Sequence, residues 1–94
     1  MTILRNYKFP NGFSLKQILD FVSAANRFKS QVSFVSGGDL LNCKGVLGMV
    51  SYFAQFPRIE EIQLIIEGTD AEEANQILES ILYTGSALMG NVKS

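Results

Sequence analysis

Segments with strand periodicity alternate with segments of helical spacing along this chain of 94 residues, and this alternation limits its possible folds. Alternating or β-branched side chains predict strands at Ile3–Phe9, Gln31–Ser36, Leu40–Cys43 and Ile62–Glu67. Apolar residues three and four apart predict helices at Ser14–Phe28, at Val46–Phe53 and from about Asp70 to Leu82. The expected fold is α+β with the order β-α-β-β-α-β-α: a small antiparallel sheet with helices on one face, an open-faced sandwich.

Turn and capping residues mark several of the boundaries. Gly37 and Gly38 supply a two-residue hairpin link that tolerates positive φ. Ser14, followed three residues later by Gln17, has the spacing of a capping box at a helix start. The pairs Thr69 with Glu72 and Asp70 with Glu73 are alternative capping signatures for the last helix. Gly48 costs a helix about 1 kcal/mol relative to alanine, so the middle helix is expected to be short and marginal.

Size and charge exclude several classes of function. The predicted apolar patterns fill one domain, residues 1–84, and residues 85–94 are expected to form a flexible tail. A net charge of −1 and a pI near 5.3 give no general attraction for nucleic acid. The apolar runs are far shorter than the roughly 20 residues of a membrane span, and no leader segment is recognisable, so we expect a cytoplasmic protein.

The supply of reactive side chains is small. The chain contains no histidine and a single cysteine, Cys43, which we expect to be buried in a strand. An internal disulfide and a Cys/His zinc site are therefore impossible within these residues. We expect a protein that is not an enzyme and that uses no metal or cofactor.

Four short motifs, in order, resemble one known family. Asn11–Lys16 resembles the active-site loop of HPr, the histidine-containing phosphocarrier of the bacterial sugar phosphotransferase system. Ala25–Val32 is similar to the helix-to-strand passage of Gram-positive HPr and of the related catabolite-repression protein Crh. Lys44–Met49 resembles the regulatory-serine segment, and Glu67–Ala74 the passage into the last helix. The resemblance covers roughly residues 7–82 and implies the HPr-like open-faced fold.

The same resemblance shows where this chain departs from the family. Ser14 stands at the position of the histidine that receives the phosphoryl group, so the family's chemistry is implied to be absent. Lys16 stands for an arginine that helps to hold that group, and Gln17 for a proline. Gly45 stands at the position of the serine modified by HPr kinase, a serine that Crh-like proteins keep. Both characteristic phosphorylation positions are therefore changed.

Ser14 supports two interpretations. A serine hydroxyl without an adjacent general base is a poor nucleophile, so we interpret Ser14 mainly as the N-cap of its helix. The exposed N–H groups of that helix start, together with Ser14, Lys16 and Gln17, remain a candidate site for a phosphate or carboxylate.

A second candidate site is apolar. The resemblance implies that partner proteins dock on the start of the first helix and on the middle helix. A short helix cannot bury apolar groups on every side, so some of these side chains should form a docking patch. About half of Val46, Met49, Val50 and Phe53 are expected to belong to the core, whereas Phe13, Leu15 and Leu47 are expected to be exposed. The candidate residues are Phe13, Leu15, Val46, Leu47, Met49 and Val50.

The main hypothesis is a non-catalytic, HPr-like regulatory or protein-binding module. Its expected partners are phosphotransferase-system enzymes or a catabolite regulator. One alternative is a phospho-switch or carrier modified on Ser14 by a protein kinase, since phosphoserine there would gain the helix N-terminus and Lys16. Another is a purely structural or self-associating domain.

Overall fold

The computed structural model of the chain describes residues 1–8, 13–56 and 61–86. These described residues form four strands and three helices in the predicted order. In chain order they are β1 (Thr2–Lys8), α1 (Leu15–Ala25), β2 (Gln31–Ser36), β3 (Asp39–Asn42), α2 (Val46–Gln55), β4 (Glu61–Glu67) and α3 (Ala71–Ser86). Phe9, the last residue of the first predicted strand, and residues 10–12 lie outside the described residues.

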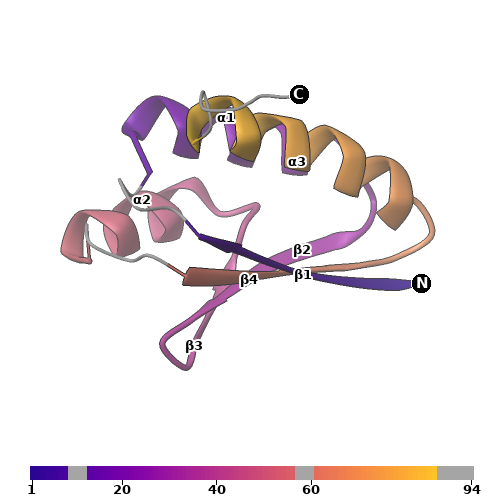
Figure 1. Ribbon diagram of the computed structural model, residues 1–94, viewed down its shortest axis with the longest axis horizontal. Helices are drawn as coiled ribbons and strands as arrows, with labels where there is room; N and C mark the ends of the chain where they lie inside the picture. Colours follow the sequence, from indigo (N-terminus) through magenta and orange to yellow (C-terminus); the bar gives the residue numbers. More distant parts are fainter. Residues whose placement is uncertain (9–12, 57–60, 87–94) are drawn as a thin grey trace.

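All four strands form one antiparallel sheet in the order β1-β4-β2-β3, so β1 and β3 are the two edges. The helices α1 and α3 contact each other and lie over the same face of this sheet, and none of the described helices covers the opposite face (Figure 1). The smaller helix α2 contacts α1 and β3 at the β3 side of the molecule. The predicted α+β architecture, an antiparallel sheet with helices on one face, is confirmed.

Strict alternation along the strands produces the core. Every second residue of β2 and β4 faces the helices and is buried, because side chains of a strand point to opposite faces in turn. The helices close the core with apolar residues that range in size from alanine to phenylalanine. The completely buried members include Phe34, Leu64, Ile66, Ala25, Cys43, Ala74, Leu78 and Leu82.

Two residues at helical apolar spacing, Leu19 and Ile77, lie near the surface, as does Leu15, which was expected to be exposed. Leu15 and Leu19 of α1 are 58% and 44% exposed, and Ile77 of α3 is 42% exposed. The face of α1 that enters the core carries Phe21 and Ala24 in addition to Ile18 and Val22. The stripe is therefore rotated away from Leu15 and Leu19, because the sheet and α3 occupy only one side of α1.

Three helix ends differ from prediction. The helix α1 ends at Ala25 rather than Phe28, since the Asn26 side chain donates to the carbonyls of Val22 (2.9 Å) and Lys44 (3.1 Å) and closes the last turn. The helix α2 continues to Gln55 despite Gly48. The helix α3 continues to Ser86, two residues into the predicted tail, and residues 87–94 lie outside the described residues.

Glycines sit where the backbone requires them. Gly37 and Gly38 have φ of 56° and 87°, and they join β2 to β3 with Ser36 paired to Asp39, which confirms the predicted hairpin. Gly68 follows β4 at a point where the chain passes directly against Ser30. A Cβ atom at Gly68 would lie 2.6 Å from the Cα of Ser30, so only glycine fits there without a shift.

Asp70 ties the start of α3 to the start of β2. Its carboxylate accepts hydrogen bonds from the backbone N–H of Lys29 (2.8 Å), the backbone N–H of Ser30 (2.9 Å) and the buried Ser30 hydroxyl. These bonds lower the pKa of Asp70, because they stabilise the charged carboxylate. The residue that the sequence suggested as a local helix cap thus joins two elements 40 residues apart.

Candidate functional site

Side chains at the start of α1 cap the backbone N–H groups of its first turn. The Ser14 hydroxyl accepts from the backbone N–H of Gln17 (3.1 Å), and the Gln17 side chain accepts from the backbone N–H of Ser14 (3.1 Å). This is the reciprocal capping box that the sequence predicts. Ser14 is therefore the N-cap of α1, as its spacing to Gln17 suggested.

This capping box reduces the number of backbone N–H groups that the predicted anion site could donate to a ligand. The N–H groups of Ser14 and Gln17 already have acceptors, whereas Leu15 and Lys16 occupy the first two helical positions, whose N–H groups have no acceptor inside a helix. The Lys16 ammonium lies 2.9 Å from the carboxylate of Asp20, one turn further along. Both side chains are exposed, so the pair is weak and Lys16 can leave it. Anion binding by Ser14, Lys16 and Gln17 stays a prediction.

The start of α2 differs chemically from that of α1. Gly45 is its N-cap and provides no side-chain hydrogen bond. Its backbone is extended, with φ −97° and ψ 104°, and a Cβ atom would meet only the Asn42 carbonyl oxygen at an ordinary 3.7 Å. The position thus has space for a serine but carries no hydroxyl that could be modified.

Two contacts hold α2 against α1. At one end, the Asn26 side chain at the close of α1 donates to the carbonyl of Lys44, just before α2 (3.1 Å). At the other end, the Phe13 ring, just before α1, lies 5.1 Å from the Phe53 ring of α2 in an edge-to-face arrangement. The first turn of α2 therefore lies near the end of α1, and the last turn of α2 lies near its start.

The six residues predicted for docking separate into exposed and packed groups. Leu47 is 81% exposed, Leu15 58% and Val46 41%. Phe13, expected to be exposed, is instead half-buried, because its ring packs on Phe34 and Phe53 of the core. Met49 is 1% exposed and Val50 is half-buried against the core, so Met49 belongs to the core.

Leu19 was not among the predicted docking residues, although it is 44% exposed. It lies one turn after Leu15, on the same side of α1, and thus extends the exposed apolar surface along this helix toward the end at which α2 begins. In the sequence Leu19 stands at helical spacing from Leu15, a pattern that fits a core-facing residue equally well. We call Leu15, Leu19, Val46 and Leu47 the α1/α2 patch.

Other parts of the described chain offer little chemistry. Cys43 is fully buried, and desolvation raises its pKa far above the ordinary range of a thiol. The described residues hold no group of three or more His, Cys, Asp or Glu placed to bind a metal. Within residues 1–8, 13–56 and 61–86, no helix has the length and apolar character that a membrane-spanning helix requires.

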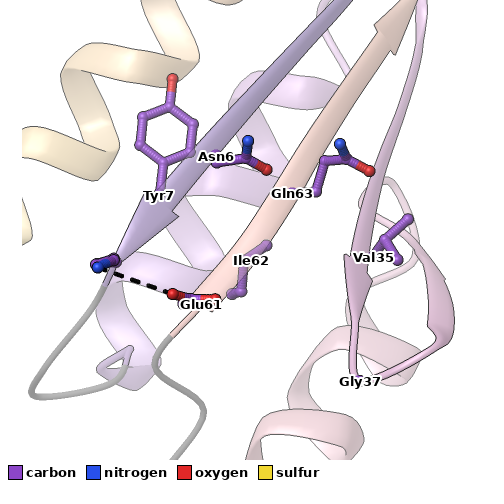
Figure 2. A pocket seen from close by; sticks show the side chains of 8 residues that line it. Asn6, Tyr7, Val35, Gly37, Glu61, Ile62 and Gln63 are labelled. Atoms are coloured by element: carbon purple, nitrogen blue, oxygen red, sulfur yellow. Dashed lines mark ion pairs between the residues drawn. The ribbon is translucent and has the colours of Figure 1, made fainter.

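A hollow of about 590 Å³ lies beside β1, β4 and β2. Figure 2 shows the amides of Asn6 and Gln63 on neighbouring strands, with Val35 on the next strand and the ion pair of Glu61 with Lys8 (3.8 Å) at one end. Both members of that pair are largely exposed. The hollow therefore contains amides and a solvated ion pair, without a nucleophile and base in contact.

Comparisons with known proteins agree with one another. The family model described as the PTS HPr component phosphorylation site matches residues 7–84. The HPr-like protein Crh of Halalkalibacterium halodurans is 32% identical over 71 residues, which are 76% of this chain and 82% of that protein.

Solved structures match as well. The histidine-containing phosphocarrier protein of a mycoplasma superposes with a TM-score of 0.73 at 16% identity, over 92% of this chain and 96% of that one. Crh of Bacillus subtilis, described as a swapped, intertwined dimer, superposes with a TM-score of 0.62 at 28% identity, over 81% of this chain and 85% of that one.

Proposed function

The chain belongs to the HPr family of the sugar phosphotransferase system, and from that membership we propose that it is a non-catalytic regulatory module that docks on partner proteins in the cytoplasm. The proposed partners are phosphotransferase-system enzymes or a catabolite regulator. In this proposal the chain keeps the family's protein-binding role and competes with a true phosphocarrier for a shared partner.

The side chains at the start of α1 support a non-catalytic role. None of the 94 residues is a histidine, so no phosphohistidine can form on them. The hydroxyl of Ser14 serves as a helix cap, and no histidine is available to act as its general base. Docking without phosphoryl transfer is the function that these residues favour.

The observation that carries the proposal is the exposure of the α1/α2 patch. Leu47, the most exposed apolar residue of the set, sits on a helix whose other side is fixed in the core by Met49 and Phe53. An exposed leucine on a rigid helix loses little conformational freedom on binding, and burial of its apolar surface contributes favourable binding free energy. The nearest charges on α1, Lys16 and Asp20, form a pair and add no net charge. A partner with an apolar pocket would fit this surface.

A competition assay tests this proposal. Enzyme I from a Gram-positive bacterium would phosphorylate a true HPr in the presence of about a ten-fold molar excess of this chain. We expect the initial rate to fall at least two-fold and this chain to remain free of phosphate. The variant Leu15→Asp/Leu47→Asp should lose the inhibition, because a carboxylate cannot be buried without a partner.

Leu40→Asp is the matched control. Leu40 is 70% exposed on β3, outside the α1/α2 patch, so its variant should inhibit as strongly as the wild type. Circular dichroism would show that each variant remains folded. Equal inhibition by Leu15→Asp/Leu47→Asp and by Leu40→Asp would show that the α1/α2 patch is not the binding surface for enzyme I. If phosphorylation by enzyme I is unaffected, the same variants are titrated against the catabolite regulator to measure whether the patch binds that partner. Absence of binding to the regulator as well would contradict the docking proposal.

Exposure of Ser14 supports the phospho-switch as the second candidate. Ser14→Ala removes the hydroxyl and also the cap, at a cost of about 1 kcal/mol in the free energy of unfolding. Competition by a folded Ser14→Ala protein should match that of the wild type under the docking proposal. Phosphate on wild-type Ser14 after incubation with cell extract, together with a changed affinity for the partner, would favour the switch instead.

A further inference from the structure

The described end of α3 lies near the start of α1. Just before α3, Asp70 bonds the Lys29–Ser30 turn that follows α1. Further along α3, Glu79 accepts a hydrogen bond from the hydroxyl of Tyr7 (3.0 Å), near the end of β1 from which the chain continues toward α1. The two helices therefore run in opposite directions (Figure 1), and Ser86, the last described residue, lies at the end of the molecule where α1 begins.

The exposed apolar side of α1 faces α2. Leu15, Leu19 and Asn26 are separated by four and seven residues and so fall on one side of the helix. Because Asn26 donates to the carbonyl of Lys44 just before α2 (3.1 Å), this side is the one turned toward α2. Ala24, on the opposite side of α1, is buried, and α3 is the other helix that contacts α1. A segment that leaves the end of α3 thus has to cross α1 to reach the α1/α2 patch.

The segment that follows α3, residues 87–94, has the composition and the length for this crossing. Its sequence contains three apolar residues larger than alanine, among them Met89 and Val92, and no acidic residue. Eight extended residues span up to about 26 Å, at about 3.3 Å each, whereas an α-helix with its side chains is about 10 Å wide. Met89 and Val92 can therefore reach across α1 to Leu15 and Leu19.

We propose that residues 87–94 cover the α1/α2 patch in the free protein, with Met89 and Val92 packed on Leu15 and Leu19, and that a docking partner has to displace them. Attachment to α3 holds this segment beside the patch at an effective concentration on the order of 1 mM, so weak contacts between apolar side chains are sufficient. The covering is a property of the free chain, whereas its effect on docking rests on the proposed function.

Nuclear magnetic resonance of the free chain tests the covering. The variant Met89→Ser/Val92→Ser removes the apolar contacts and keeps the length of the segment. We expect the backbone amide signals of the α1/α2 patch to shift relative to the wild type, whereas the signal of Leu40, 70% exposed on β3, keeps its position. A synthetic peptide of residues 87–94, added at about millimolar concentration, should move the patch signals of the double variant back toward their wild-type positions.

Asn91→Ser is the matched control, because it changes a polar residue of the same segment and removes no apolar surface. The patch signals of this variant should coincide with those of the wild type. Three results would each overturn the covering: patch signals that coincide in the wild type and the double variant, equal shifts in Asn91→Ser, or shifts confined to residues outside the patch.

The competition assay with enzyme I measures the effect on docking separately. If the segment covers the patch at least half of the time, it weakens the apparent affinity at least about two-fold, so the double variant should inhibit at no more than about half the wild-type concentration. Unchanged inhibition by a double variant whose patch signals have shifted would contradict the regulatory role. Shifted patch signals without binding to enzyme I or to the catabolite regulator would support the covering and contradict the proposed function.

Discussion

At the scale of single residues, two glycines of this chain have opposite effects on the stability of the fold. Gly68 lies directly against Ser30, so a methyl group there has no space. Gly48 lies on an exposed face of α2, where an added Cβ would meet nothing within 4 Å. The first glycine is required by the packing of the chain, whereas the second only weakens a helix through its backbone entropy.

Gly48→Ala and Gly68→Ala should therefore shift stability in opposite directions. We expect Gly48→Ala to raise the free energy of unfolding by about 1 kcal/mol, the difference in helix propensity. Gly68→Ala should lower it by about 2 kcal/mol or more, because the new methyl group forces Ser30 and its neighbours to move. Urea unfolding of both variants beside the wild type measures this, and changes of the same sign would contradict the assignment.

At the scale of elements, Asp70 is the polar link between β2 and α3. Its carboxylate bonds the Lys29–Ser30 turn, and these bonds lower its pKa. A carboxyl group whose pKa is lower in the folded than in the unfolded chain stabilises the fold above its unfolded pKa, near 3.9. That stabilisation is lost as pH falls through the folded pKa.

Asp70→Asn should accordingly lower the melting temperature most at neutral pH. The difference from the wild type is expected to shrink as pH falls from about 4 through the lower pKa of the folded carboxyl, below which the wild-type side chain is protonated too. Asp20→Asn, on the exposed side of α1, serves as the control and should follow the wild-type pH profile. Thermal melts between pH 2.5 and 7, followed by circular dichroism, would contradict the link if Asp70→Asn kept a constant offset from the wild-type melting temperature.

Elements whose signals are local could be predicted from sequence. The capping box of α1 and the Gly37–Gly38 hairpin each depend on residues within a few positions of one another, and both are present. Exposure of the site residues was harder to predict, because it depends on distant neighbours. Phe13 is half-buried because Phe34 and Phe53 lie beside it, and Leu19 is exposed because the core covers the other side of α1.

At the scale of the whole molecule, the reactivity of the single thiol, Cys43, measures how often the core opens. Cys43 is fully buried where β3 leads into α2, and burial raises its pKa, so the reactive thiolate is scarce in the native state. The backbone N–H of Cys43 also donates to the Val32 carbonyl (2.9 Å), which holds this residue against β2. Reaction at this sulfur therefore requires the core to open.

We expect alkylation of Cys43 by iodoacetamide to be strongly suppressed in the native protein. The rate should rise with urea in parallel with global unfolding, because opening of the core limits access to the sulfur. Mass spectrometry of quenched samples gives the modified fraction, and the fully unfolded protein supplies the reference rate. Rapid labelling without denaturant would show that the α2 region opens by itself.

Gly45 has a consequence for how this protein can change through evolution. An extended backbone and free space around its Cα mean that the fold accepts glycine or serine there, with a difference of only a few tenths of a kcal/mol at an N-cap. Mutation can thus remove or restore a hydroxyl at the head of α2 without remodelling the structure. The requirements of folding therefore do not decide whether the residue at this position carries a hydroxyl.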